Sequence, residues 1–273
     1  MTSIYDKFSM QGRVALVTGG AGLLGKEFCL TLAQAGAEVY AADLNRDAAE
    51  STALTISQQG LTTRGIALDV TDPVSVQAVV AEIVSRSGRI DVLVNSAAMD
   101  PKFDPDHAVT SSNAFETYPL SSWQDALNVN LTGPFLVSQA VARQMVLQGK
   151  GSIINICSTY GLGGPDQRIY EKPGQPKMYK PVYYTVTKAG ILGLTKYMAT
   201  YYAGSEIRVN ALTPGGVFAG HDDEFVKNYS ARTVIGRMAH KDEMNGALLF
   251  LASDASSYMT GGNLVVDGGW TAW

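Results

Sequence analysis

The chain has 273 residues, of which 46 % are apolar and 17 % charged, and its formal net charge is −4. This composition is typical of a globular protein with enough apolar material for a core, and it offers no basic field for nucleic acid or an anionic membrane surface. The two cysteines, Cys29 and Cys157, and the three histidines show no spacing that a disulfide framework or a metal site requires. The start of the chain lacks the apolar region of a signal peptide, and there is no run of about 18 apolar residues. We therefore expect a cytoplasmic protein with no metal, no nucleic-acid partner and no membrane association.

Apolar strands alternate with helices along the chain. Strands are predicted at 14–17, 38–42, 64–68, 90–94, 152–156, 207–211 and 264–266, and helices from the Gly-rich turn to about 35 and at about 46–59, 73–88, 121–148, 183–202 and 242–252. Asp72-Pro73 is typical of a helix start, and Gly88 of a helix end. Strands that are apolar throughout and alternate with helices indicate a parallel sheet that is covered on both faces. We predict an α/β fold: one Rossmann-type, doubly wound domain over residues 1–273 with about seven parallel strands.

Two polar segments, 99–119 and 162–182, interrupt this alternation after the fourth and fifth strands. Loops of this length in a compact domain are usually functional or disordered. Because ligands of a doubly wound sheet bind at the carboxyl ends of its strands, we expect both inserts to form walls or a lid over a pocket. Their polar and basic side chains indicate a small hydrophilic substrate and favour an anionic one, although a solvated loop surface would carry the same residues. The basic side chains are Lys102, Arg168, Lys172, Lys177 and Lys180.

A Gly-rich stretch, TGGAGLLG from Thr18 to Gly25, lies where the first strand turns into a helix. Glycine allows a tight turn and a close approach to a pyrophosphate, and the helix N-terminus offers free N–H groups and a positive dipole end. A Gly-rich turn without a ligand is the alternative.

Asp43 ends the second strand, where a carboxylate can accept hydrogen bonds from both hydroxyls of an adenosine ribose. A 2′-phosphate would face this negative charge, and neither Leu44 nor Asn45 is basic. The pattern therefore predicts NAD rather than NADP, with a simple helix cap as the alternative. Asp69-Val70 follows the third strand and is expected to border the adenine, unless Asp69 is only a turn residue.

The stretch PVYYTVTK, 181–188, holds two adjacent tyrosines and a lysine. At the angular step of an α-helix, Tyr184 and Lys188 differ by about 40° and share a face, whereas Tyr183 and Lys188 differ by about 140°. Only Tyr184 can act with Lys188 as a unit, and a nearby ammonium group favours the phenolate form of a tyrosine. An ordinary pair on a helix surface would show the same spacing.

Taken together and in order, these motifs resemble those of the short-chain dehydrogenase/reductase superfamily, in its short single-domain branch, over nearly the whole chain. The resemblance rests on the Gly turn, Asp43, Asp69-Val70, Asn95-Ser-Ala-Ala98, Asn130 in VNLTG, Ser158 in INICSTYG, Tyr184-x-x-x-Lys188, Ile207-Arg-Val-Asn210, Pro214-Gly215 and the terminal VDGG.

The resemblance implies a catalytic tetrad of Asn130, Ser158, Tyr184 and Lys188. The tyrosine would be the acid/base, the lysine would hold the nicotinamide ribose and lower the pKa of the tyrosine, the serine would bind the substrate oxygen, and the asparagine would support a water relay. It also implies a homodimer or homotetramer that pairs the helices at 121–148 and 183–202. The expected cofactor contacts are Gly19, Gly22, Leu23, Leu24, Gly25, Asp43, Leu44, Asp69, Val70, Asn95, Ser96, Ala97, Tyr184, Lys188, Pro214, Gly215 and Val217.

The sequence departs from the family pattern in four places. The Gly turn reads TGxxGxxG, with Leu23 where the short branch usually has glycine, and this spacing is similar to that of extended-branch epimerases and dehydratases. The usual NNAG is Asn95-Ser-Ala-Ala98, Ala219 stands where threonine is common, and Tyr184 follows Ser158 at about twice the usual separation.

The predicted function is an NAD-dependent oxidoreductase that transfers hydride between a secondary alcohol or ketone of a sugar, sugar phosphate or polyol and nicotinamide. Alternatives are a sugar-nucleotide epimerase or dehydratase that retains NAD, and a non-catalytic dinucleotide-sensing protein. The arrangement is also similar to oxidoreductases of bacterial surface-glycan and nonulosonic-acid pathways.

Overall fold

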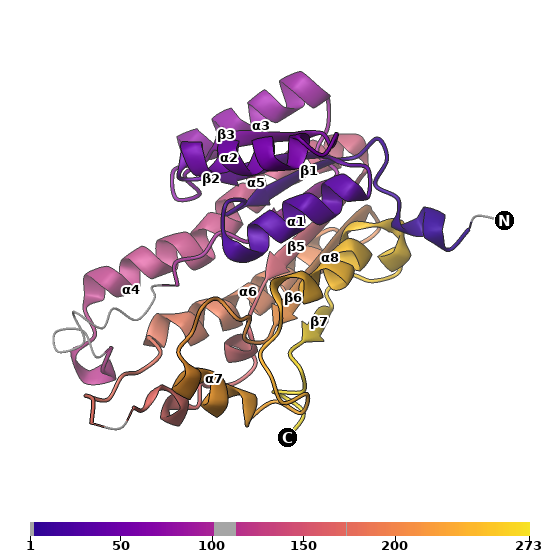
Figure 1. Cartoon of the computed structure of the whole chain (residues 1–273). Coiled ribbons are helices and arrows are strands. Elements are labelled where there is room, and N and C mark those ends of the chain that lie inside the picture. The colour runs from indigo at the N-terminus through magenta and orange to yellow at the C-terminus, as the bar shows by residue number, and fades with distance from the viewer. Residues whose placement is uncertain (1–2, 101–112, 173) are drawn as a thin grey trace.

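The computed structural model describes residues 3–100, 113–172 and 174–273, and shows one seven-stranded, all-parallel sheet with helices on both faces (Figure 1). The strands are β1 (Val14–Thr18), β2 (Glu38–Asp43), β3 (Thr63–Ala67), β4 (Val92–Asn95), β5 (Lys150–Ile156), β6 (Glu206–Pro214) and β7 (Asn263–Val266). Their order across the sheet is β3-β2-β1-β4-β5-β6-β7. The chain therefore returns from the β3 edge to the middle of the sheet between β3 and β4, which creates the switch point where such sheets bind ligands. This confirms the predicted α/β doubly wound fold.

The helices are α1 (Leu23–Gln34), α2 (Arg46–Ser57), α3 (Pro73–Ser87), α4 (Leu120–Leu127), α5 (Gly133–Gln148), α6 (Val182–Tyr201), α7 (Asp223–Ser230) and α8 (Asn245–Ala252). The expected caps of α3 are present: the Asp72 carboxylate accepts from the N–H groups of Val74 and Ser75, and Gly88 adopts a left-handed conformation at the other end.

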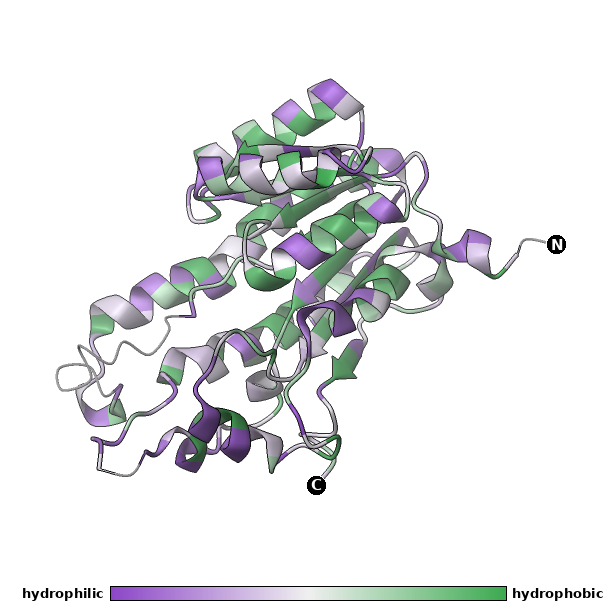
Figure 2. Ribbon diagram, viewed as in Figure 1, coloured by the Kyte–Doolittle hydropathy of each residue, from purple (hydrophilic) through white to green (hydrophobic). Residues whose placement is uncertain are grey.

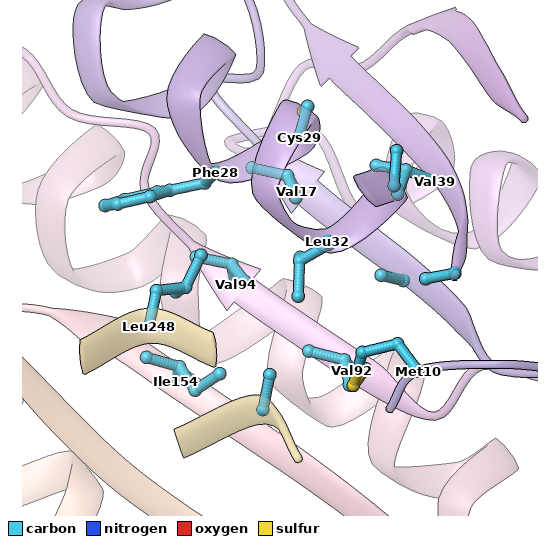
Figure 3. Close-up of a cluster of buried hydrophobic side chains, with 14 of the residues drawn as sticks. Met10, Val17, Phe28, Cys29, Leu32, Val39, Val92, Val94, Ile154 and Leu248 are labelled. Carbon is cyan, nitrogen blue, oxygen red and sulfur yellow. The ribbon is translucent and has the colours of Figure 1, made fainter. Parts of the chain in front are cut away.

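Two apolar clusters hold the helices against the sheet. Helices α1, α2 and α8 pack on one face, where Phe28, Leu32 and Leu248 gather over Val17 and Ile154 (Figure 3). Helices α3, α5 and α6 pack on the other face. Figure 2 shows the central strands as predominantly hydrophobic, as expected for strands that are covered on both sides.

The structure differs from the predicted elements in two places. The single helix predicted at 121–148 is divided into α4 and α5 by a π-helical turn, Asn128–Thr132. Helix α7, a short element rich in charge, was not predicted at all. Among the described residues, no helix combines the length and the apolar character that a bilayer crossing requires.

Candidate active site

A cavity of about 420 Å³ lies at the carboxyl ends of β1, β4, β5 and β6. It is lined by twelve of the residues that the sequence assigned to the site: Gly19, Gly22, Leu23, Leu24, Gly25, Ser96, Ser158, Tyr184, Lys188, Pro214, Gly215 and Val217. The structure thus brings the Gly-rich turn and the Tyr184–Lys188 pair, which are far apart in sequence, to the wall of one cavity.

The Gly-rich turn requires glycine at two positions for steric reasons. Gly19 has φ +65°, and a Cβ there would lie 2.8 Å from Cα of Ala97. A Cβ at Gly25 would overlap the carbonyl oxygen of Gly19, so the first turn of α1 can approach the turn only with glycine at this position. The close packing is present although the glycine spacing departs from the usual one. The turn presents its backbone and the start of α1 to the cavity, as an anion-binding turn does.

Asp43 lies beside that turn. Its Oδ2 accepts a hydrogen bond from the Ala21 N–H at 3.1 Å, and its Oδ1 accepts from the Asn45 N–H at 3.1 Å. The carboxylate is therefore held at the end of β2 against the turn, with acceptor capacity remaining on each oxygen.

The expected cofactor residues that are not among the described residues lining the cavity are Asp43, Leu44, Asp69, Val70, Asn95 and Ala97. Next to them, hydrogen bonds fix the backbone at the end of β4. The N–H groups of Ser96 and Ala97 both donate to the Thr18 hydroxyl at 3.1 Å. Asn95 is buried and donates to Ser138 and Asn155 inside the core.

Three further expected contacts flank the turn at the edges of β2 and β3. Asp69 accepts hydrogen bonds from the backbone and hydroxyl groups of Thr71. Val70 is buried and lies against Gly133 at the start of α5, and Leu44 is exposed.

Ser158, Tyr184 and Lys188 converge in the cavity from β5 and α6. Ser158 follows β5, and its hydroxyl accepts from the Tyr160 N–H at 3.2 Å. The Lys188 ammonium donates to the Ile156 carbonyl at 2.9 Å and lies 5.7 Å from the ring centroid of Tyr184. Tyr183 faces away and packs near Tyr118, with ring centroids 6.1 Å apart. Helical geometry therefore selected the tyrosine that reaches the cavity.

Burial is the largest effect on the pKa values of Tyr184 and Lys188. It raises the pKa of Tyr184 above its ordinary value, against a smaller lowering by the hydrogen bond with Ser158, and it lowers the pKa of Lys188. The lowering of the Tyr184 pKa by Lys188 stays a prediction; in the protein alone, desolvation is the largest effect on the pKa of each group.

Asn130 lies in the π-helical turn and is 2 % exposed. Its Nδ2 donates to the Met99 carbonyl at 3.0 Å, and its Oδ1 accepts from the Met99 N–H at 2.6 Å. The side chain therefore holds the first residue of the first insert, and it is not among the described residues that line the cavity. A π-helical turn inserts an extra residue per turn and commonly marks a functional site.

The second insert forms part of the cavity wall, as predicted, through Tyr170 and Lys180. Lys180 forms an ion pair with Asp100 at 2.6 Å, and its ammonium lies 4.1 Å from the ring centroid of Tyr184. The other described basic residues of the inserts pair outside the cavity: Arg168 with Asp166, Lys172 with Asp222, and Lys177 with Glu171. Lys102 and most of the first insert, 101–112, lie outside the described residues.

A further part of the cavity wall, packed against the second insert through Tyr170 and Phe225, comes from a region that the sequence reasoning missed. Tyr229 of α7 accepts a hydrogen bond from the Gly216 N–H, and its ring stacks on Trp270 with centroids 4.3 Å apart. Phe225 and His221 stack beside it at 4.9 Å. Aromatic residues at one-turn spacing in α7 and a tryptophan directly after VDGG were the available signals.

Comparisons with known proteins agree with this architecture. A family model described as Enoyl-(Acyl carrier protein) reductase matches residues 20–271. The chain is 35 % identical to D-threitol dehydrogenase of Mycolicibacterium smegmatis, over 98 % of this chain and 96 % of that protein. It is 36 % identical to a 3-oxoacyl-(acyl-carrier-protein) reductase of Thermotoga maritima, over 95 % of this chain and 98 % of that protein. The crystal structure of a gluconate 5-dehydrogenase from Burkholderia cenocepacia in complex with NADP and tartrate superimposes with a TM-score of 0.84 at 33 % identity, covering 99 % of this chain and 100 % of that one.

The fold, the Gly-rich turn and these matches define an oxidoreductase of the Rossmann type that uses a nicotinamide cofactor. The chain belongs to the short-chain dehydrogenase/reductase superfamily. The expected similarity to surface-glycan oxidoreductases is not borne out, because the relatives found are named for other substrates.

Proposed function

We propose that the protein is an NAD-dependent dehydrogenase of a small polar secondary alcohol, of the sugar or polyol class, with Tyr184 as the acid/base. The observation that carries this proposal is the convergence of Ser158, Tyr184 and Lys188 in one cavity with the Gly-rich turn. Two of the three relatives named above are dehydrogenases of a polyol and a sugar acid, which supports a polar substrate; the acyl reductase among them does not.

Each residue has a role that follows from its position. Ser158 orients the substrate hydroxyl, Tyr184 takes the hydroxyl proton as the carbon loses its hydride, and Lys188 supplies positive charge next to Tyr184. A bound oxidised nicotinamide supplies the hydride acceptor and a second positive charge. Since burial raises the pKa of Tyr184, this added charge is needed for the phenol to act as a base near neutral pH.

Asp43 supports the choice of NAD. A 2′-phosphate at the end of β2 would meet a carboxylate that two backbone N–H groups already hold in place, and Leu44 and Asn45 provide no cation. The Burkholderia relative is in complex with NADP, so the preference of this chain for NAD needs a direct test.

The exposed apolar side chains of α5 and α6 support a homo-oligomer. Phe135, Val146, Leu147, Tyr197 and Tyr201 are all exposed along these two helices, which is typical of an interface. We propose that a second copy of the chain covers this face. We also propose, as a separate point, that the protein acts in the cytoplasm.

The test is NADH formation across a panel of polyols, sugars and sugar phosphates. We expect turnover with a subset of these substrates and a loss of about 10²–10⁴-fold in kcat for Tyr184→Phe, the range for a general acid/base. Full activity of Tyr184→Phe would refute the mechanism. NAD that stays bound without net NADH would favour an epimerase or dehydratase instead, and NAD binding without turnover of any kind would favour a sensing protein.

Asp43→Ala, assayed beside the wild type, tests the cofactor choice. We expect the ratio of kcat/KM for NAD to that for NADP to fall at least tenfold. An unchanged ratio would show that Asp43 does not contact the ribose.

A further inference from the structure

The ion pair of Asp100 and Lys180 occupies the cavity beside the reactive tyrosine. Lys180 Nζ lies 2.6 Å from Asp100 Oδ1, and the Lys180 side chain is only 13 % exposed. Asp100 belongs to the first insert and Lys180 to the second, and the inserts are joined again where Asn113 Nδ2 donates to the Tyr179 carbonyl at 3.2 Å. The described parts of the two inserts therefore contact each other, and next to Tyr184 they present a paired acid and base to whatever binds there.

This pair determines the charge that a substrate meets. Apart from His221, the charged side chains among the described residues lining the cavity are Asp100, Lys180 and Lys188. Lys188 is buried and donates to the Ile156 carbonyl, beneath Tyr184. Among the described residues at the substrate end, and apart from His221, the charges are thus those of Asp100 and Lys180, which pair with each other. An entering carboxylate or phosphate that bonds to the Lys180 ammonium would lie beside the Asp100 carboxylate and meet its like charge.

A neutral polyol meets no such penalty. Each of its hydroxyls both donates and accepts, so neighbouring hydroxyls can bond to the carboxylate and to the ammonium while the pair stays intact. The adjacent wall adds further neutral hydroxyls: Tyr170 donates to the Tyr160 oxygen at 3.0 Å, and burial raises the pKa of both phenols, which keeps them uncharged.

We propose that Asp100 and Lys180 act as a substrate-selecting pair that favours an uncharged polyol over an aldonate or sugar phosphate with the same carbon skeleton. This rests on the proposed function and specifies its substrate class. It also replaces the anionic substrate that the basic residues of the inserts suggested. Of the four basic residues that the structure describes there, three pair outside the cavity and Lys180 pairs with Asp100 within it; Lys102 lies outside the described residues.

The experiment compares matched substrates from four to six carbons, each polyol beside the aldonate in which one terminal CH₂OH is a carboxylate. The measured quantity is the ratio of kcat/KM for the polyol to that for the aldonate. A ratio cancels changes in the chemical step that both substrates share, including any change in the acidity of Tyr184. We expect a ratio of at least about ten in the wild type and a drop of at least about tenfold, or about 1.4 kcal/mol, in Asp100→Asn.

Two further variants test the pair from other directions. Lys180→Met leaves the Asp100 carboxylate unpaired, so the ratio should rise or stay high while both efficiencies fall. Lys177→Met removes a lysine that pairs with Glu171 outside the cavity and should leave the ratio within twofold of the wild type.

A wild-type preference for aldonates, or an Asp100→Asn ratio within twofold of the wild type, would overturn this inference while the proposed dehydrogenase stands. No NADH from any polyol, sugar, sugar phosphate or aldonate would overturn the proposed function, and this inference with it.

Discussion

Replacing Asn130 by leucine tests how the π-helical turn holds the start of the first insert. The side chain makes two hydrogen bonds to Met99, one to its carbonyl and one from its N–H. Leucine has the same branching at Cγ, with a somewhat larger volume, but can make neither bond. Met99 immediately precedes Asp100, so the variant should loosen the position of the proposed substrate-selecting pair as well as the fold.

The size of the effect follows from the groups left unpaired. A buried backbone donor or acceptor without a partner costs about 1–3 kcal/mol. Asn130 is buried, but Met99 is partly exposed, so water can reach one side of the broken bonds. We therefore expect the lower part of the range for two groups, a loss of about 2–3 kcal/mol in the free energy of unfolding.

Asn130→Asp tests the same two hydrogen bonds through their dependence on pH. An ionised carboxylate still accepts from the Met99 N–H but opposes the Met99 carbonyl, whereas a protonated carboxyl can donate to it. Burial and this repulsion raise the folded-state pKa of the introduced acid above its unfolded value of about 3.9. The stabilisation by the protonated carboxyl is therefore complete below the unfolded-state pKa of about 3.9, and it is lost as the pH rises through the folded-state pKa.

The assay is urea unfolding at pH 5.5 and 7.5 at one protein concentration, with Asn128→Asp as the matched control. Asn128 lies in the same turn but makes a solvent-exposed hydrogen bond with Gln124, so its replacement should change the free energy of unfolding by less than about 0.5 kcal/mol. The reasoning fails if Asn130→Leu is as stable as the control, or if Asn130→Asp gains nothing relative to the wild type at the lower pH.

Three other predictions follow from the site and the helices around it. Gly25→Ala should weaken NADH binding at least tenfold by fluorescence titration, because its Cβ would overlap the Gly19 carbonyl oxygen; Gly246→Ala, which meets nothing within 4 Å, should bind NADH normally. Leu147→Glu should lower the mass measured by light scattering, since Leu147 is 83 % exposed on the proposed interface; an unchanged oligomeric mass would exclude this face. The kcat/KM for alcohol oxidation should rise with pH between 7 and 9.5, because burial raises the pKa of Tyr184 and more phenolate forms as the pH increases; a flat profile would contradict Tyr184 as the base.

The elements that sequence reasoning located well are those whose signal is local. The strands are apolar because both faces of the sheet are covered, and Asp72-Pro73 and Gly88 mark the two ends of α3. The choice of Tyr184 over Tyr183 needed only the angular step of a helix. The π-helical turn at Asn130 was not predicted. VNLTG is rich in weak helix formers, but weak helix preference does not specify a π-helical turn, because this distortion depends on the packing around it.

The sequence by itself determined the doubly wound sheet, the Gly-rich turn and which of the two tyrosines shares a helix face with Lys188, because periodicity, glycine geometry and spacing act over a few residues. Tertiary structure decided the character of the substrate end of the cavity. Counting lysines in the inserts favoured an anionic ligand, but charge counts do not say which charges meet each other. Folding brings Asp100 to Lys180 across 80 positions of sequence and pairs Lys172 with Asp222 outside the cavity. It also places Tyr229 in the cavity wall, where its ring stacks on Trp270. Such pairings arise only when distant segments are packed together, because an ion pair depends on distance in space and not on separation along the chain.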